Sequence, residues 1–315
     1  MNLGVARPDA LPDARQRGFV SRLTPDFALP FVQLARLDRP IGWQLLLAPC
    51  WQSVALAGLA AHHGPDLWRL LLFFVGAVAM RGAGCTYNDI LDRDLDAGVE
   101  RTKGRPLPSG RVTPRAAAIF IIAQALVGFA VLLAFNRFTI ALGLASLIVV
   151  AIYPLLKRVT SWPQVGLGLA FSWGALMGWA AQYGALAPPA LLLYLSAVAW
   201  TIGYDTIYAL QDARDDAIVG IRSTARLFGA HARLGIGAFY LAAALCAQAA
   251  LVMAGAGLVA EIGWAAFAAH LLWQVSQVEG ASPATALRLF RANRDAGLLL
   301  FAGFAFEGWL RAALG

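Results

Sequence analysis

The chain has 315 residues, of which 59% are hydrophobic and only 14% are charged, and its formal net charge is +7. A soluble domain contains about 25% charged residues, so this composition excludes an ordinary soluble protein. The excess of Lys and Arg does not indicate nucleic acid as a partner, because basic residues gather in the cytosolic loops of membrane proteins.

The hydrophobic residues form long runs. A membrane-spanning helix needs about 20 predominantly apolar residues. Nine runs approach that length, near 41–61, 67–88, 115–136, 139–156, 164–183, 188–209, 233–254, 257–277 and 296–313. Strands are not indicated, because these runs are too long for barrel strands and do not alternate. The sequence therefore predicts an all-α, polytopic membrane protein with about nine transmembrane helices.

The two ends of the chain fit this topology. Residues 1–30 are polar and lack the apolar segment of a signal peptide. We expect them to form a disordered cytosolic arm, followed by a single intramembrane domain over residues 31–315. With a cytosolic N-terminus, most of the 25 Lys and Arg residues fall on the cytosolic side, as the positive-inside rule requires. Arg81 is an exception, because it falls inside a span.

The acidic residues gather in two short stretches. Five of the 18 Asp and Glu residues lie in 89–100, and four lie in 205–216. Each stretch follows an apolar run, and the topology places both at the cytosolic ends of helices. Carboxylates beside hydrocarbon are costly, and where they persist they usually have a partner or a task. For two stretches that match in side and spacing, ordinary solvated loop charge is the weaker explanation.

The spacing within each stretch indicates what the task is. Asn88, Asp92 and Asp96 are four residues apart, as are Asp212 and Asp216, so each set shares one helix face. Asp94 and Asp215 point away from these faces. Mg²⁺ prefers oxygen ligands, takes one or two carboxylates and completes its shell with water and substrate phosphates. Two such faces directed at each other would hold Mg²⁺ ions that bridge a diphosphate.

Basic residues follow each acidic stretch. The first is followed by "VERTKGRPLPSGR", with Lys103 and Arg105, and the second by "GIRSTARLFG", with Arg222. Arg binds phosphate oxygens in a bidentate manner and Lys acts as a point charge, so these loops suit a diphosphate. The positive-inside rule alone would also place Arg here, and for each single residue both explanations stay open.

These motifs resemble a known family. "NDILDRDLD" and "YDTIYALQDARDD" match the two aspartate motifs of the UbiA-type intramembrane prenyltransferases. Similar stretches extend over about residues 30–313, namely "RLDRPIGWQLLLAPCW", "RGAGCTYND", "RTKGRPLPSG", "YPLLKR", "GIRSTARLFG" and "FRANRDAGLLLF". In this combination they are most similar to the 4-hydroxybenzoate branch of the family. Arg39 stands where a Lys is common and Tyr87 where a smaller apolar residue is common.

The resemblance implies a helical bundle around a central cavity, with cap loops on the cytosolic side. It implies an enzyme that uses Mg²⁺ to move a polyprenyl group from polyprenyl diphosphate to a ring carbon of 4-hydroxybenzoate, in ubiquinone biosynthesis. Asn88, Asp92 and Asp96 then match the first metal motif, and Asp212 and Asp216 match the second. Tyr153 and Lys157 match an element near the diphosphate. Asp92 and Asp212 are the principal catalytic candidates.

The acceptor's carboxylate calls for a cation. Arg81 lies seven residues before Asn88, two turns back on about the same helix face, and a charge inside a span is a functional candidate. It either binds the acceptor or pairs with an aspartate. Arg36 and Arg39 at the start of the first span are rival candidates. Asp205 is a weaker candidate for polarising the acceptor hydroxyl.

Two other readings stay open. A relative of the same family would use a naphthoate, homogentisate, haem or chlorophyllide acceptor. A cation transporter would spread charged residues along a path through the bilayer, whereas here the acids cluster at one face. We expect an integral protein of a bacterial inner membrane, surrounded by lipid, with its active site on the cytosolic side.

Overall fold

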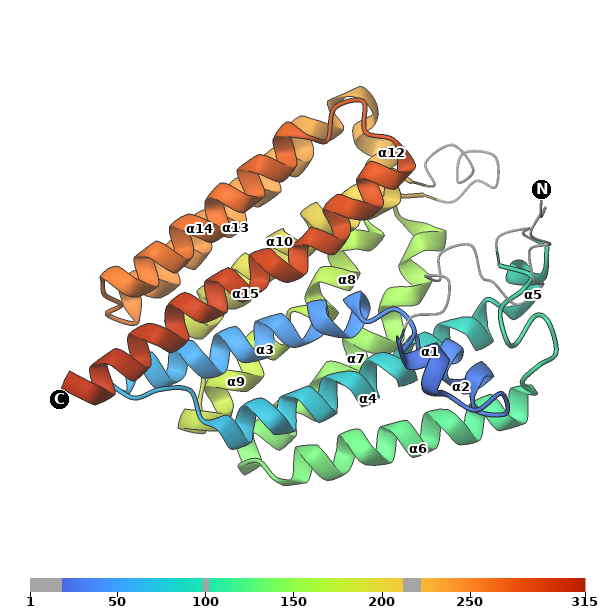
Figure 1. Cartoon of the computed structure of the whole chain (residues 1–315), viewed down its shortest axis with the longest axis horizontal. Coiled ribbons are helices and arrows are strands. Elements are labelled where there is room, and N and C mark those ends of the chain that lie inside the picture. Colours follow the sequence, from blue (N-terminus) through green and yellow to red (C-terminus); the bar gives the residue numbers. More distant parts are fainter. Residues whose placement is uncertain (1–18, 99–101, 212–221, 315) are drawn as a thin grey trace. The chain divides into compact units, whose positions relative to one another are not determined.

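The computed structural model describes residues 19–98, 102–211 and 222–314. Within these ranges all regular secondary structure is helical, which confirms the all-α prediction (Figure 1). In chain order the helices are α1 (Phe19–Leu23), α2 (Leu29–Leu34), α3 (Ile41–Ala60), α4 (Leu67–Leu91), α5 (Arg93–Ala97), α6 (Pro114–Leu133), α7 (Arg137–Val159), α8 (Pro163–Phe171), α9 (Gly174–Tyr183), α10 (Pro188–Ala209), α12 (Thr224–Phe228), η1 (Gly229–His231), α13 (Ala232–Met253), α14 (Leu258–Ser276) and α15 (Pro283–Leu314).

Two of the predicted runs differ from the observed helices. The run 164–183 is divided into α8 and α9, because Ser172 and Trp173 interrupt it with shorter-range hydrogen bonds, such as that from the Ala175 N–H to the Ser172 carbonyl at 2.8 Å. α15 begins at Pro283, thirteen residues before the predicted start at 296. Its first part is polar in sequence, so hydropathy alone does not reveal it.

Within the described residues, six helices are long and apolar enough to cross a membrane by length and composition. They are Leu67–Leu91, Pro114–Leu133, Pro188–Ala209, Thr224–Met253, Leu258–Ser276 and Pro283–Leu314. α7 adds a shorter apolar stretch, Arg137–Tyr153. These helices make the chain an integral membrane protein, while the number of nine spans stays a prediction.

The chain divides into two compact units. The first unit comprises Met1–Gln44 and Val75–Val131, and the second comprises Leu45–Phe74 and Leu132–Gly315. Helices α1 and α2 lie at the end of the arm that the sequence predicts to be disordered over residues 1–30. Residues 1–18 lie outside the described part, so the arm itself and its cytosolic placement stay predictions.

The first unit packs α2 and the last turns of α4 against α6 and the loop before it. Its core contains Leu34, Leu107, Val112 and Ala117. Phe31 of α2 meets Phe120 of α6 edge-on, with ring centroids 5.2 Å apart. These contacts hold the loop after α5 beside the end of α4, which is where the first aspartate motif lies.

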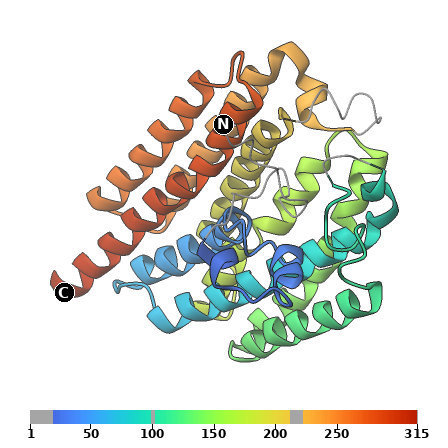
Figure 2. The ribbon, with the colours of Figure 1, turned by 45° about the vertical axis from the view of Figure 1, so that its right-hand side comes forward.

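The second unit is built around four long helices. α10 packs along α13, α13 along α14, and α14 along α15, as both ribbon views show (Figures 1 and 2). α14 and α15 approach closely where glycines face each other, since a Cβ on Gly263 would lie 2.5 Å from the Cα of Gly303. Small residues that allow such close approach are typical of helix contacts in membranes.

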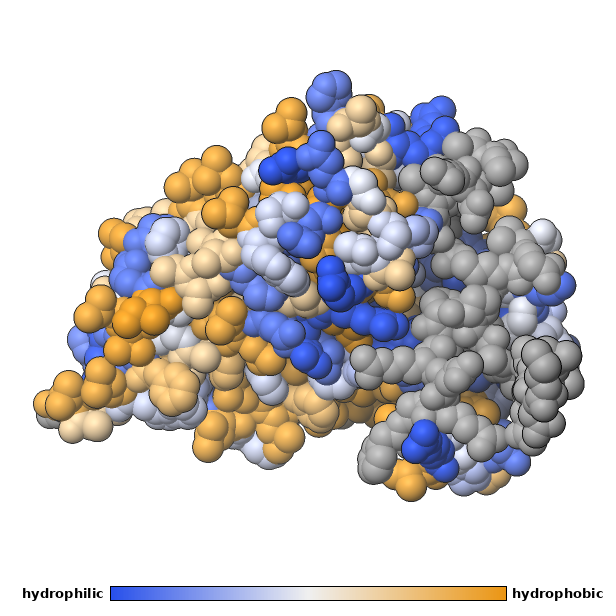
Figure 3. All heavy atoms as spheres, turned by 45° about the horizontal axis from the view of Figure 1, so that its top comes forward, coloured by the Kyte–Doolittle hydropathy of each residue, from blue (hydrophilic) through white to orange (hydrophobic). Residues whose placement is uncertain are grey.

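Large apolar side chains remain on the surface. On α6 of the first unit only Ala117 is buried, and Ile119, Ile122 and Leu126 are exposed. Figure 3 shows the same property on one face of the molecule, where apolar side chains occupy much of the surface between hydrophilic ones. Exposed apolar surface of this extent is expected where lipid rather than water is the solvent.

Candidate active site

The end of α4 and the short helix α5 present the first aspartate motif. α4 ends at Leu91, and Asp92 leaves helical geometry with φ −97° and ψ 3°. The four-residue hydrogen bonds nevertheless continue, from the Asp92 N–H to the Asn88 carbonyl at 3.0 Å and from the Asp96 N–H to the Asp92 carbonyl at 2.8 Å. Residues four apart are therefore still about one helical turn apart across the junction of α4 and α5.

The carboxylates of this motif differ in their exposure. Asp92 is 6% exposed and Asp96 is 8% exposed, whereas the Asp94 side chain is 88% exposed. Asp94 pairs with its neighbour Arg93, at 3.0 Å. Asp92 and Asp96 are thus buried acids, and Asp94 is a solvated one.

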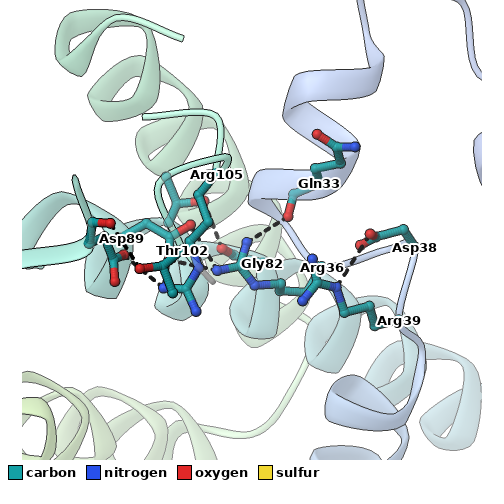
Figure 4. Close-up of polar contacts among 10 residues, drawn as sticks. Gln33, Arg36, Asp38, Arg39, Gly82, Asp89, Thr102 and Arg105 are labelled. Carbon is teal, nitrogen blue, oxygen red and sulfur yellow. Dashed lines mark hydrogen bonds and ion pairs between the residues drawn. The ribbon is translucent and has the colours of Figure 1, made fainter. Parts of the chain in front are cut away.

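Asp89 is the most buried acid of the motif, and it pairs with arginine (Figure 4). Arg36 Nη2 donates to both carboxylate oxygens of Asp89, at 2.7 and 2.9 Å. Arg105 Nη1 lies 3.5 Å from Asp89 Oδ1 and donates to Asp96 Oδ2 at 2.7 Å. Arg105 therefore joins two acids that lie two helical turns apart.

The loop after α5 holds Arg105 in this place. Thr102 Oγ1 donates to the Asp96 carbonyl at 2.9 Å, which ties the loop to α5. Arg111 Nη1 donates to Gln33 Oε1 at 2.9 Å, which ties the loop to α2. Lys103, the other predicted diphosphate ligand of this loop, is exposed.

Arg36 and Arg39 flank the turn between α2 and α3. Arg36 has a positive φ of 57°, which L residues rarely adopt, and its Nη1 donates to the Gln33 carbonyl at 2.8 Å. Burial is the largest single influence and lowers the pKa of Arg36, but Asp89, together with Cys85 and Asp38, raises the pKa above its ordinary value. Arg39 Nε lies 3.3 Å from Asp38 Oδ2. Of the three arginines predicted to bind the acceptor, Arg36 and Arg39 thus each have a carboxylate partner.

Arg81 lies in α4, within the first unit. Its guanidinium packs directly on Gly42 at the start of α3, where a Cβ would lie only 2.7 Å from Nε. Any larger residue at position 42 would force the arginine to move. The glycine at position 42 therefore leaves room for the Arg81 side chain.

The remaining predicted residues belong to the second unit. Asp205 lies in α10 and Tyr153 in α7, and both side chains are partly buried. Arg222 Nη1 donates to the Val159 carbonyl at 3.2 Å, which brings it to the end of the helix that contains Tyr153 and Lys157. The Lys157 side chain, Asp212 and Asp216 lie outside the described part. That the two aspartate motifs face each other stays a prediction.

The donor set of the first motif suits a hard cation. Its side chains supply the carboxamide oxygen of Asn88 and the carboxylate oxygens of Asp92 and Asp96. Asp92 and Asp96 are buried. In the described ranges, no three His, Cys, Asp or Glu side chains gather closely enough to hold a metal ion by themselves. Two carboxylates completed by phosphate oxygens are the usual arrangement for Mg²⁺, so the residues fit this ion.

Sequence reasoning assigned no task to Asp89. Its spacing of seven from Asp96 was the available signal, because residues seven apart lie on the same helix face two turns away. Its partner Arg36 is 53 residues earlier in the chain, a distance at which spacing carries no information.

Asp89→Asn is expected to destabilise the protein, because it leaves the Arg36 guanidinium with an uncompensated buried charge, whereas Arg105 keeps Asp96 as a partner. Breaking a buried ion pair from one side costs about 3–5 kcal/mol. The measurement is an SDS titration of unfolding in mixed micelles. Asp94→Asn is the matched control, since an exposed substitution stays within about 0.5 kcal/mol. Equal stability of the two variants would show that the Arg36–Asp89 pair contributes nothing.

Comparison with known proteins shows which family this chain resembles. The profile of the UbiA prenyltransferase family matches residues 46–302. The mitochondrial 4-hydroxybenzoate polyprenyltransferase of Aedes aegypti is 46% identical over 87% of this chain, which spans 62% of that relative's length. The enzyme of the same name from Rattus norvegicus is 46% identical over 87% of this chain and 73% of its own, and that from Homo sapiens is 42% identical over 95% and 82%.

Solved structures show the same fold. A UbiA homologue from Aeropyrum pernix K1 superposes with a TM-score of 0.69 at 25% identity, over 82% of this chain and 96% of its own. A UbiA homologue from Archaeoglobus fulgidus, solved with GPP and Mg²⁺ bound, superposes with a TM-score of 0.65 at 19% identity, over 90% and 99%. The family match covers most of the chain and all three buried acids of the first motif, Asp89, Asp92 and Asp96. The chain belongs to the UbiA prenyltransferase family.

Proposed function

We propose that this protein transfers a polyprenyl group from polyprenyl diphosphate to 4-hydroxybenzoate, at the ring carbon ortho to the hydroxyl. The allylic C–O bond of the donor breaks, a C–C bond to the ring forms, and diphosphate and the ring proton leave. The proposed product serves ubiquinone biosynthesis. The observation that carries the proposal is the pair of buried acids Asp92 and Asp96, of which Asp96 is bound to Arg105, in a chain 42–46% identical to enzymes of that name.

The first unit supplies groups for the diphosphate. Arg105 offers a fixed guanidinium whose orientation Asp89 and Asp96 determine. Mg²⁺ held by Asn88, Asp92, Asp96, Asp212 and Asp216 would neutralise the charge that develops on the leaving diphosphate. Lys103, Tyr153, Lys157 and Arg222 are the further residues proposed for this group. Cations fixed in advance cost no reorganisation when the C–O bond ionises.

The reaction also requires that water is kept away from the allylic cation. An allylic cation reacts with water unless the site is dry, and apolar helices provide such surroundings. The polyprenyl tail is apolar and suits contact with lipid-exposed helices. No nucleophilic side chain is needed, because the acceptor ring itself attacks the cation.

Arg81→Ala is expected to raise the acceptor KM and leave the KM for the prenyl diphosphate unchanged. A charge-assisted hydrogen bond to a buried carboxylate contributes about 1.5–3 kcal/mol, which corresponds to about ten- to a hundred-fold in affinity. Both KM values are measured on the same purified variant. Arg81→Lys should rescue only partly, because Lys cannot form a bidentate pair.

An unchanged acceptor KM in well-folded Arg81→Ala protein would exclude the carboxylate role. Arg36 or Arg39 would then take it. A loss of Mg²⁺ and diphosphate binding instead would assign Arg81 to balancing the aspartates.

The direct test of function is incubation of purified protein with a polyprenyl diphosphate, Mg²⁺ and 4-hydroxybenzoate, followed by identification of the product by mass. Parallel reactions with a naphthoate, homogentisate, haem or chlorophyllide address related acceptors. A prenylated product from one of these alone would overturn the choice of acceptor. Cation flux in proteoliposomes without any product would favour a transporter.

The membrane in which the reaction occurs is a separate matter. The relatives described above are named mitochondrial enzymes, which does not support the bacterial inner membrane expected from the sequence. A cytosolic-side active site likewise stays a proposal. Protease accessibility of the loop at 102–112 in sealed vesicles measures the orientation.

A further inference from the structure

Asn293 of α15 lies at the centre of a buried polar cluster in the second unit. The cluster takes one residue from each of four helices, namely Trp200 of α10, Tyr240 of α13, Gln274 of α14 and Asn293 of α15. Trp200 Nε1 donates to Asn293 Oδ1 at 2.8 Å, and Asn293 Nδ2 donates to Gln274 Oε1 at 2.9 Å. The Tyr240 hydroxyl donates to Gln274 Oε1, also at 2.9 Å.

This cluster fixes how the helices are rotated. Polar groups within apolar surroundings are costly when unpaired, and a fully paired network specifies a single packing arrangement. Turning α10 about its axis would withdraw the Trp200 N–H from Asn293. Sliding α15 along its axis would break the Asn293 bonds to both Trp200 and Gln274.

A column of aromatic residues extends this contact along α10. Trp200, Tyr204 and Tyr208 are four residues apart and lie on one helix face. Phe290 of α15 lies between the last two, with its ring centroid 5.9 Å from that of Tyr204 and 4.7 Å from that of Tyr208. One face of α15 therefore holds the last two turns of α10.

Gly297, on the same face of α15, permits the close approach. A Cβ at this position would lie 2.7 Å from Cη2 of Trp200. Phe290, Asn293 and Gly297 all belong to the stretch "FRANRDAG", to which the chemistry of the site assigns no task. All three contact the aromatic column.

The end of α10 also leads into the second aspartate stretch. Asp205 directly follows Tyr204, and Asp212 comes three residues after Ala209, the last residue of α10. We propose that Asn293 is a positioning residue, which with Phe290 sets the rotation and register of α10 and thereby places Asp205 and the start of the second aspartate motif. This inference rests on the proposed function.

The test compares Asn293→Ala with Ser196→Ala. Ser196 lies one turn before Trp200 on the same face of α10 and donates to the Ala243 carbonyl at 2.7 Å, so its loss also removes a buried hydrogen bond between helices. The first readout is the thermal stabilisation of detergent-solubilised protein by geranyl diphosphate at increasing Mg²⁺. The second is prenyl transfer, with kcat and the acceptor KM determined separately.

For Asn293→Ala, the Mg²⁺ concentration that gives half of the thermal shift should rise about tenfold, the lower end of the effect of losing a residue that orients metal ligands. The kcat should fall, and the acceptor KM should not change. Ser196→Ala should change neither the Mg²⁺ concentration nor kcat. Two results overturn the proposal: unchanged Mg²⁺ dependence in Asn293→Ala, or an equal rise in both variants.

Phe290→Leu serves if Asn293→Ala does not fold. It keeps the polar cluster and removes the ring contact to Tyr204 and Tyr208, and the same rise in the required Mg²⁺ concentration is expected. An unchanged value in Phe290→Leu would overturn the proposal. Wild-type protein that gives the thermal shift but no product would overturn the proposed function alone, and wild-type protein that gives neither would overturn both.

Discussion

Asp92→Ala is expected to abolish prenyl transfer while the protein still inserts and folds. Asp92 is buried at the junction of α4 and α5, and its spacing from Asn88 and Asp96 gives all three one helix face. A metal ion contributes several kcal/mol of charge stabilisation, and each 1.4 kcal/mol is tenfold in rate. Turnover should therefore fall by more than about a thousand-fold. The measurement is kcat of purified protein at saturating substrates.

Asp94→Ala is the matched control two residues away. Its side chain is exposed and pairs with Arg93 at the surface, so turnover should stay near that of the wild type. Asp212→Ala should be as severe as Asp92→Ala, and the double variant should be little worse than either, because residues that act as a unit are not additive. If Asp94→Ala were as inactive as Asp92→Ala, the assignment of the metal-binding face would be wrong.

Most of the helical framework could be predicted, because long apolar runs leave the chain no alternative in a membrane. The predicted run 188–209 and α10 have the same bounds. The division between α8 and α9 could not be predicted, since "LGLAFSWGALMG" is apolar except for Ser172 and the break depends on local hydrogen bonding. The start of α15 was missed for the opposite reason, because Arg288, Arg291 and Asn293 make its first turns polar.

The candidate site could be predicted only where the signal is local. The four-residue spacing of Asn88, Asp92 and Asp96 identified the buried acids within one segment. The pairing of Arg36 with Asp89 and the cluster around Asn293 each join residues from distant parts of the chain. Such pairings depend on how the helices pack, and neither composition nor spacing predicts them.

Withdrawal of divalent cations is expected to stop the reaction completely. The buried carboxylate of Asp96 pairs with Arg105, but a diphosphate would bring further negative charge beside the buried carboxylates of Asp92 and Asp96. Like charges brought together in a site of low dielectric repel strongly. Without a divalent cation, the donor should therefore not bind productively.

Purified protein is treated with EDTA, passed into metal-free buffer and assayed with and without added Mg²⁺. Activity should be absent after treatment and should return fully with Mg²⁺, and the melting temperature of the protein without substrates should not change. EDTA already saturated with Mg²⁺ is the control for effects of the chelator itself. Asp92→Ala protein should not regain activity at any Mg²⁺ concentration that restores the wild type, which links the requirement to this carboxylate. Turnover that survives thorough removal of metal would show that Arg105 and the other cations are sufficient for the diphosphate, and the acids would then need another task.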